Sequence, residues 1–403
     1  MDIEQIYPKK VVYPDFLRNR IERFYDHRVR KEWGDRLLSR GRRPDHQAIL
    51  VNHNDYLLLA GHAQVREAQR RVLDEEGNGP MMSAVFLNEP NATWDVEQAF
   101  AAFVGARDAI LTQSGFAANL GLLQVLTGPD TPVYIDHMAH MSLWVGARLG
   151  GAKIVPCRHN DVNAFEHKIR RYGSGVVVVD SVYSTDGSVA PLQEICALAK
   201  THGCLMLVDE SHSLGTHGPE GRGLVHELGL GDTVDFITAS LAKAFAGRAG
   251  LIACGSRFKN YFLSQSLPTI FSSATAPHDA AGLLAGLEVI RSADWRRIRL
   301  FRAADALRKA LRTTGHTISD SRSQIISLNF TSEWAMLDAR DVMESMGVFG
   351  APFAPPATPK RRPCLRISVH SGLGKRHIER IVAAARSALP VDETVNAVRA
   401  IAC

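Results

Sequence analysis

The chain has 403 residues, of which 45% are hydrophobic and 22% are charged, and 47 Lys and Arg against 42 Asp and Glu leave a net charge of +5. These values are ordinary for a folded globular protein, and they exclude a disordered, collagen-like or membrane-spanning chain. The aliphatic run at residues 176–179 is far shorter than the ~20 residues that cross a bilayer, and residues 1–4 are acidic where a signal peptide would be basic. We therefore expect a cytoplasmic protein with neither a membrane nor a nucleic acid as partner.

Residues 1–54 predict a helical arm. The segment is rich in arginine and carries acidic side chains three or four positions away, the spacing at which opposite charges pair along a helix. The favoured interpretation is an exposed helix with internal ion pairs. The alternative is a surface that binds a phosphorylated substrate. The basic residues are Arg18, Arg20, Arg23, Arg28, Arg30, Lys31, Arg36, Arg40, Arg42 and Arg43.

Residues 55–290 alternate short aliphatic runs with helical patterns. Continuous Val, Ile and Leu runs between helices are typical of an α/β domain with a mostly parallel sheet that helices cover on both faces. Ligands of such sheets bind beyond the carboxyl ends of the strands. The expected strands are residues 109–113, 133–136, 153–156, 176–181, 205–209, 235–239 and 251–254, and the expected helices include residues 116–126, 142–149, 165–171 and 192–201.

A long helical pattern from residue 279 to about residue 313 leads into a region of different composition. There, residues 324–330, 364–369 and 376–388 predict a strand, a second strand and a helix. We take this region as a second, smaller α+β domain. The predicted division is an N-terminal arm at 1–54, a large α/β domain at 55–290 and a small C-terminal domain at 291–403.

The six cysteines form no Cys-x-x-Cys pair, and none stands at zinc spacing from a histidine. We therefore expect reduced, buried cysteines and no metal site. The cysteines are residues 157, 196, 204, 254, 364 and 403.

Three loops that follow predicted strands end in polar residues. The first follows residues 205–208 and begins with Asp209-Glu210, which could be the Mg²⁺-binding half of an NTPase. That function also needs a glycine-rich phosphate loop, and Gly374-Lys375 lacks the upstream glycine, so the NTPase interpretation fails.

The second loop carries Ser240 and Lys243 in the order Ser-x-x-Lys, the acylation motif of penicillin-recognising enzymes. The Ser-Asp-Asn and Lys-Thr-Gly tripeptides that accompany that motif do not occur, so an acyl-serine hydrolase is disfavoured. In the third loop, residues 113–119, a strand turns through Gly115 into a helix, and free backbone N–H groups at a helix start can bind phosphate.

Together the three loops fit pyridoxal 5′-phosphate (PLP). This cofactor needs a lysine for a Schiff base, a carboxylate against its pyridinium nitrogen and a cradle for its phosphate. Lys243 is the expected lysine and Asp209 the expected carboxylate, and the amides of Gly115 and Phe116 with the hydroxyl of Ser240 would hold the phosphate. Ionised Asp209 would keep the ring nitrogen protonated, so that the ring can accept the electrons of a carbanion.

Several strings are too long and too well spaced to arise by chance, namely residues 54–57, 139–144, 180–185, 208–212, 212–219, 238–243 and 365–368. They resemble the motifs of the α-oxoamine synthases, PLP enzymes of fold type I that join an amino acid to an acyl-CoA. Within that family the chain is most similar to the autoinducer synthases of the α-hydroxyketone quorum-sensing system. The resemblance covers nearly the whole chain, and it implies a large domain with a mostly parallel sheet, a smaller C-terminal α+β domain and an N-terminal helical arm.

The resemblance also implies roles for residues around the cofactor. His140 would stack on the pyridine ring, and His212 would hydrogen-bond the phenolic oxygen of the ring. These two would form the catalytic set with Lys243 and Asp209. The implied cofactor-binding residues are Ser114, Gly115, Phe116, His140, Ser184, Asp209, His212, Ser240, Lys243, Ser272 and Ser273.

The substrate side of the site is implied in the same way. Arg366, assisted by Asn54, would grip the carboxylate of the amino acid, a task that suits the fork of a guanidinium. The alternative is a structural role for Arg366 within the small domain. Ser272 and Ser273 would reach the phosphate from the second subunit of a homodimer whose active site is shared.

The implied reaction begins when Lys243, as general base, removes the α-proton of the amino-acid donor. The carbanion would attack the acyl-CoA thioester, and release of CoA and CO₂ would give an α-aminoketone. The donor would be S-adenosylmethionine or 2-aminobutyrate, the acyl group would be of medium length, and the product would be a precursor of an α-hydroxyketone signal.

Three departures from the family pattern bear on the substrates. Leu58 replaces a family glycine, Trp94 replaces a family histidine, and Met81-Met82 stands in the family's glycine-rich stretch. Bulky apolar groups near the substrate entry suit a long acyl chain, because each buried CH₂ contributes ~0.8 kcal/mol. They put glycine, serine and alanine in doubt as donors.

Other functions stay open at this point. An aminotransferase, or an 8-amino-7-oxononanoate or glycine-type synthase, would use the same cofactor site. A non-enzymatic, DNA-binding regulator is disfavoured, because the segment ahead of Asn54 lacks two compact apolar helices joined by a glycine turn.

Overall fold

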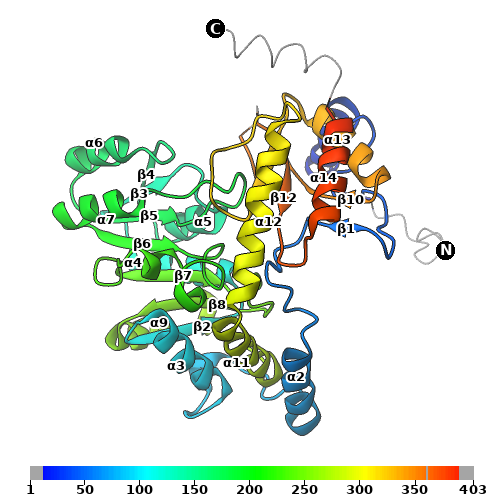
Figure 1. Ribbon diagram of the computed structural model, residues 1–403. Coiled ribbons are helices and arrows are strands. Elements are labelled where there is room, and N and C mark those ends of the chain that lie inside the picture. Colours follow the sequence, from blue (N-terminus) through cyan, green and yellow to red (C-terminus); the bar gives the residue numbers. More distant parts are fainter. Residues whose placement is uncertain (1–11, 360–361, 390–403) are drawn as a thin grey trace.

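The computed structural model describes residues 12–359 and 362–389. At its centre lies a seven-stranded sheet in the order β2-β8-β7-β6-β5-β3-β4 (Figure 1). The strands from β7 to β4 in this order are parallel, and β8 runs antiparallel to both of its neighbours. The mostly parallel sheet predicted from the sequence is therefore present. Its strands are β2 (Asp108–Thr112), β3 (Pro132–Asp136), β4 (Lys153–Cys157), β5 (Val176–Asp180), β6 (Leu205–Asp209), β7 (Phe236–Ser240) and β8 (Gly250–Cys254).

Helices cover both faces of this sheet. Successive side chains of a strand point to opposite faces, so Val176 and Val178 enter the core beneath α4 and α5, while Val177 and Val179 enter the core beneath α3, α6 and α7. All four valines are buried, which explains why the strand is a continuous aliphatic run. The helices of this part of the chain are α2 (Ala63–Glu76), α3 (Ala92–Val104), α4 (Gly115–Leu126), α5 (Met141–Leu149), α6 (Val162–Tyr172), α7 (Leu192–Thr201), α8 (Leu224–Glu227), α9 (Ser256–Gln265) and α10 (Leu267–Ile270), with the short helices η3 (Ala84–Phe86) and η4 (Pro219–Gly221).

The C-terminal part contains a three-stranded antiparallel sheet in the order β11-β12-β9. A two-residue parallel pairing of β1 with β10 connects the end of the arm to this part. The predicted division at 54/55 and 290/291 stays a prediction. The elements here are β1 (Ile49–Leu50), β9 (Ile325–Asn329), β10 (Val348–Phe349), β11 (Ala351–Phe353), β12 (Cys364–Ser368), α13 (Glu333–Ser345) and α14 (Lys375–Ser387).

The long helical pattern at residues 279–313 forms two helices, α11 (Pro277–Ser292) and α12 (Asp294–Arg312). Together they span the predicted helical range, and the chain breaks between them at Ala293, which has a non-helical ψ of 41°. The break changes the direction of the chain, so that α11 packs against α2 on the large sheet, while α12 contacts β9 and α14 (Figure 1). Apolar side chains continue through the break because both helices bury one face.

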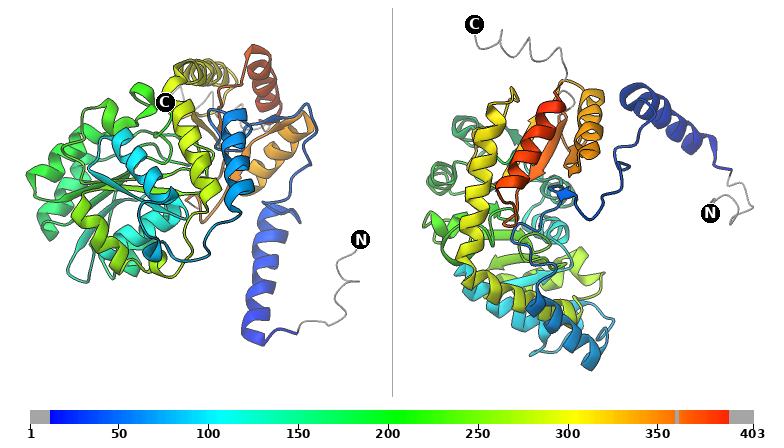
Figure 2. Two further views of the ribbon diagram at one scale, coloured as in Figure 1. Left: turned by 90° about the horizontal axis from the view of Figure 1, so that it is seen from below. Right: turned by 45° about the vertical axis from the view of Figure 1, so that its right-hand side comes forward.

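The arm begins with α1 (Asp15–Phe24), which has no buried residue, and continues as the π-helical η2 (Tyr25–Glu32). In Figure 2, α1 extends away from the rest of the molecule. Ion pairs within the arm link Arg18 to Asp15, Arg30 to Asp26 and Arg28 to Glu32, as the favoured interpretation of this arginine-rich segment expects. Arg28 and Trp33 also bond to Glu333 of α13, which fixes the base of the arm.

The five cysteines in the described part of the chain are unpaired and buried, as expected, and Cys403 and the acidic residues 1–4 lie outside it. Within residues 12–359 and 362–389, no helix has the length and apolar character that a bilayer crossing requires. The same residues contain no group of three or more His, Cys, Asp or Glu side chains placed to hold a metal ion.

Candidate active site

A cavity of about 220 Å³ opens at the carboxyl ends of β5, β6 and β7, where the start of α4 meets them. This is the edge at which ligands bind in parallel sheets. Eight residues predicted from the sequence line it, together with three that were not predicted: Asn119, Asp180 and Ser211. The eight are Ser114, Gly115, Phe116, His140, Asp209, His212, Ser240 and Lys243.

Lys243 lies in the turn between β7 and β8. Burial lowers the pKa of its ammonium to about 8, although the charges of Asp209 and Asp180 favour the protonated form. None of the described residues makes a hydrogen bond or ion pair with the amine. A partly unprotonated, unpaired lysine is what covalent attachment of an aldehyde cofactor requires.

Asp209 ends β6 and is buried. Its two carboxylate oxygens accept hydrogen bonds from Asn119 Nδ2 at 2.6 Å and from the backbone N–H of Ser211 at 2.8 Å. Its register partner on β5 is Asp180, the pKa of which lies well above the usual range because of burial and of the neighbouring Asp209 charge. The two carboxyl groups are therefore neighbours, and Asp209, which lines the cavity, can face a pyridinium nitrogen.

The cradle for a phosphate lies at the start of α4. Ser114 caps this helix by accepting the N–H of Ala117 at 3.1 Å, which leaves the amides of Gly115 and Phe116 without helical partners. A Cβ at Gly115 would lie 2.6 Å from the Cβ of Ser240, so only glycine lets the helix start approach the end of β7. Free amides beside the Ser240 hydroxyl suit a dianionic phosphate.

Two histidines face the same cavity. His140 is the N-cap residue of α5, and its Nδ1 lies 2.7 Å from the hydroxyl of Ser142. His212 is buried, and its Nδ1 lies 2.6 Å from the hydroxyl of Tyr56. Burial and the nearby cations of Lys243 and Arg366 hold the pKa of His212 well below its ordinary value, so the ring is neutral.

Arg366 belongs to β12 and is 5% exposed. Its guanidinium donates to the Ser184 carbonyl at 2.8 Å and to Asn54 Oδ1 at 2.9 Å, and it lies 4.6 Å from the ring centre of Phe353. Its Nε has no partner, and no carboxylate in the described part of the chain pairs with it. A buried guanidinium without a counter-ion favours an anionic ligand, as the predicted carboxylate-binding role requires.

Ser272 and Ser273 lie outside this cavity. The hydroxyl of Ser272 bonds to the Pro268 carbonyl, and the Ser273 carbonyl accepts Gln113 Nε2 at 2.7 Å. Their predicted role at the phosphate of a second subunit stays a prediction. Leu58 and Trp94 also lie outside it: Leu58 borders Gly372, with a Cδ1 that would lie 2.6 Å from an added Cβ there, and Trp94 lines another cavity.

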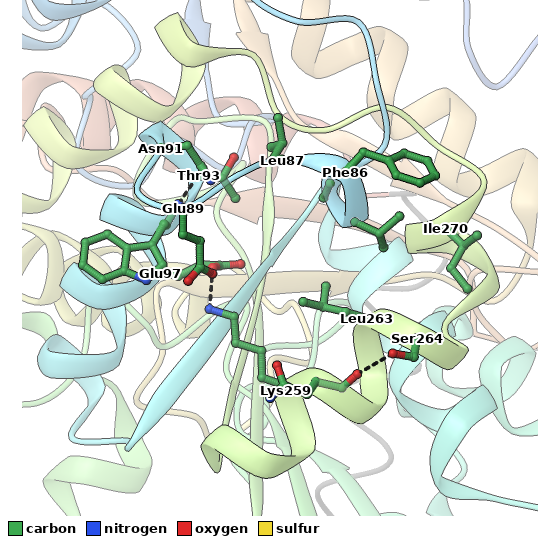
Figure 3. Close-up of a pocket in the computed structure, with 14 residues that line it drawn as sticks. Phe86, Leu87, Glu89, Asn91, Thr93, Glu97, Lys259, Leu263, Ser264 and Ile270 are labelled. Atoms are coloured by element: carbon green, nitrogen blue, oxygen red, sulfur yellow. Dashed lines mark hydrogen bonds and ion pairs between the residues drawn. The ribbon is translucent and has the colours of Figure 1, made fainter.

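That other cavity, of about 650 Å³, lies beside β2 between η3, α3 and α9 (Figure 3). At its wall, the ammonium of Lys259 is 2.7 Å from Glu97 and 3.3 Å from Asp108. The residues predicted to bind cofactor or substrate do not line this cavity. We therefore place the candidate active site at the smaller cavity.

Some residues near the cavity were missed because their partners are distant in sequence. Tyr56 reaches His212 across 156 residues, and Asn119 reaches Asp209 across 90. Asp180 carried a usable signal: it ends an aliphatic strand next to the strand that ends in Asp209.

The chain is similar to a known protein family, to several known enzymes and to solved structures. The class I and II aminotransferase family matches residues 47–384. The CAI-1 autoinducer synthase of Vibrio campbellii is 43% identical over 381 residues, which are 94% of this chain and 97% of that protein. An 8-amino-7-oxononanoate synthase of Mycobacterium sp. is 33% identical over 329 residues, 81% of this chain and 85% of that protein. A solved structure of serine palmitoyltransferase (SPT) with a PLP internal aldimine gives a TM-score of 0.81 at 28% identity, over 85% of this chain and 87% of that chain.

Proposed function

Because the chain belongs to the class I and II aminotransferase family, and within it to the α-oxoamine synthases, we propose that it makes the precursor of a quorum-sensing autoinducer. The enzyme is a PLP-dependent acyl-CoA:amino acid C-acyltransferase, and the predicted PLP fold type I is confirmed. The proposed reaction joins S-adenosylmethionine or 2-aminobutyrate to the acyl group of a medium-chain acyl-CoA, with release of CoA and CO₂. Its product is an α-aminoketone that leads to an α-hydroxyketone signal.

The observation that carries the autoinducer assignment is the 43% identity to a CAI-1 autoinducer synthase over 94% of the chain. The 8-amino-7-oxononanoate synthase matches at 33% over a smaller share. The departures at Leu58, Trp94 and Met81-Met82 lie outside the active-site cavity, so the assignment does not rest on them.

The proposed roles of the residues follow from their contacts. Bound PLP supplies an electron sink for negative charge at the α-carbon of the donor. Lys243, with a pKa of about 8, removes the α-proton as general base. The carboxylate of Asp209 would hold a proton on the pyridine nitrogen of bound PLP, and Arg366 with Asn54 orients the carboxylate of the donor.

The other predicted residues in and near the cavity also have proposed roles. The amides of Gly115 and Phe116 and the Ser240 hydroxyl anchor the phosphate, and His140 and His212 contact the ring. Ser184 contributes through its carbonyl, which holds Arg366 in place.

A homodimer with a shared active site is part of the proposal. The segments that carry Ser83 and Ser273 meet in a short antiparallel bridge, and large apolar side chains beside this bridge are exposed. Burying them against a second copy would remove apolar surface from water and bring Ser272 and Ser273 to the edge of the partner's site. The exposed side chains are Met81, Met82, Phe86, Leu267 and Phe271.

Product analysis by mass spectrometry tests the proposal. One mixture holds the enzyme with PLP, an acyl-CoA ladder, and S-adenosylmethionine, 2-aminobutyrate, glycine and serine in competition. The expected result is one aminoketone series derived from S-adenosylmethionine or 2-aminobutyrate, with a preferred medium chain length. A glycine or serine product would instead favour the glycine-type or serine-type synthases.

The aminotransferase alternative has a separate arm in the same experiment. In this arm 2-oxoglutarate replaces acyl-CoA. Formation of glutamate here, together with no aminoketone in the arm that holds acyl-CoA, would overturn the acyl-transfer proposal. Lys243→Ala is the matched control, and full turnover by this variant would also contradict the proposed chemistry.

A further inference from the structure

A chain of hydrogen bonds connects Asp209 to His140 through two buried side chains. Asn119 Nδ2 donates to Asp209 Oδ2 at 2.6 Å and to Ser142 Oγ at 2.9 Å. The hydroxyl of Ser142 in turn lies 2.7 Å from His140 Nδ1. Asn119 comes from α4, Ser142 from the first turn of α5 and Asp209 from the end of β6, so the chain links three elements of the cavity wall.

The direction of each bond in this chain is determined. The amide of Asn119 must turn its nitrogen to Asp209, because its oxygen would face a carboxylate that cannot donate. Both amide hydrogens are then used, and Ser142 Oγ accepts one of them. The single hydroxyl hydrogen of Ser142 is therefore free to go to His140 Nδ1.

An independent contact gives the same result. The backbone N–H of Ser142 also points to His140 Nδ1, at 3.3 Å, and a backbone nitrogen can only donate. His140 Nδ1 is thus an acceptor from two directions and carries no hydrogen. Burial, chiefly, lowers the pKa of His140, so the ring is neutral and its one hydrogen is on Nε2.

We propose that Asn119 and Ser142 are positioning residues that hold His140 in the Nε2–H tautomer, so that it presents a hydrogen-bond donor to an oxygen of the substrate. This inference rests on the proposed function, in which the oxygen is that of the thioester carbonyl of the acyl-CoA. This oxygen gains negative charge when the carbon nucleophile attacks the carbonyl carbon. A fixed donor stabilises such charge without reorganisation. The unpartnered Oδ1 of buried Asn119, which lines the same cavity, leaves one further acceptor there for a bound group.

The test is ¹⁵N NMR of the histidine rings in the PLP-loaded enzyme, with the signal of His140 identified by its loss in His140→Gln. The expected wild-type spectrum shows an unprotonated Nδ1 and a protonated Nε2. Ser142→Ala is expected to give a mixture of tautomers and to lower kcat by about tenfold with an unchanged KM for acyl-CoA, because a misplaced ring hydrogen removes the donor. Ser266→Ala, an equally buried serine outside the cavity, is the matched control and should change neither.

A proton on Nδ1 of wild-type His140 would overturn the inference even if Ser142→Ala failed to fold. A Ser142→Ala variant that keeps both the spectrum and kcat would overturn the positioning role of Ser142. The wild-type spectrum does not depend on turnover. An enzyme that forms no aminoketone would therefore refute the proposed function while leaving the tautomer measurable.

Discussion

The hydroxyl of Tyr56 lies 2.6 Å from Nδ1 of His212, and both side chains are buried. The same hydroxyl donates to Asn54 Oδ1 at 3.3 Å, so Tyr56 connects the ring of His212 to the residue that also binds Arg366. Gln324 fixes the backbone of His212 by donating to its carbonyl at 2.7 Å.

Tyr56→Phe keeps the ring of the residue and removes this bond. Nδ1 of His212 would be left buried without its hydrogen-bond partner, and the ring would lose the contact that holds its orientation. We expect an altered absorbance spectrum of bound PLP and a fall in kcat of about tenfold. Tyr261→Phe loses a comparable hydroxyl bond to the Val125 carbonyl outside the cavity and should leave both unchanged. A normal spectrum and rate in Tyr56→Phe would contradict the arrangement.

Arg366→Lys keeps the positive charge and removes the fork. An ammonium cannot hold the Ser184 carbonyl, Asn54 and a carboxylate together, so the KM for the amino-acid donor should rise by about tenfold or more, with the KM for acyl-CoA nearly constant. Spectral titration of the holoenzyme with the donor measures this. Arg297→Lys, at a similarly buried arginine of α12 that bonds to the Ile290 carbonyl, is the control.

Loss of stability in Arg366→Lys with unchanged donor affinity would support the structural alternative for Arg366. That alternative is weakened by the absence of a carboxylate partner among the described residues, since a purely structural buried cation is normally paired.

Gly115→Ala would push the start of α4 away from β7, because the new Cβ would meet the Cβ and Cα of Ser240 at 2.6 and 2.8 Å. Displaced amides bind phosphate less well, so the affinity for PLP should fall by about tenfold or more, with roughly 1–3 kcal/mol lost from overpacking. Gly128→Ala, where an added Cβ meets nothing within 4 Å, should behave as wild type. Unchanged PLP affinity in Gly115→Ala would place the phosphate elsewhere.

The sequence was informative where a residue's role depends on its own strand and loop. Lys243, Asp209 and Gly115 each follow a buried aliphatic strand, so their place at the carboxyl edge of the sheet could be predicted. Asn119, Ser142 and Tyr56 could not be predicted, because their roles come from contacts between helices and loops that tertiary packing brings together. The break at Ala293 was missed for a related reason: the apolar periodicity continues through it, and only the change of packing partner reveals it.

The pH dependence of cofactor attachment tests the environment of Lys243. The unprotonated amine is the nucleophile, and burial lowers its pKa from 10.5 to about 8. The rate at which apoenzyme binds PLP covalently should therefore rise with pH and reach half its maximum near pH 8, as followed by stopped-flow absorbance. Asp209→Asn removes a charge that favours the ammonium, so its midpoint should move to lower pH. A midpoint near 10 in the wild type would contradict the buried position.

We expect the ion pair of Lys259 with Glu97 to contribute to stability and not to catalysis. Both side chains are 7% exposed, and although burial alone would lower the pKa of Lys259, Glu97 and Asp108 raise it, so the amine is charged. Lys259→Met leaves two carboxylates unpaired beside β2 and should lower the free energy of unfolding by about 3–5 kcal/mol. The kcat of the folded variant should stay near the wild-type value, because this cavity is separate from the one that contains Lys243.

Denaturant unfolding of three variants distinguishes the buried charge from a simple loss of packing. Glu97→Gln combined with Lys259→Met should recover part of the loss, because a neutral amide still accepts the Leu111 N–H, which Glu97 binds at 2.8 Å. Arg70→Ala breaks a pair of exposed ion pairs on α2 and should have no measurable effect, since water already solvates those charges. If Lys259→Met proved as harmless as Arg70→Ala, the carboxylates would have to be neutral or hydrated, and the pair would not stabilise the edge of the sheet.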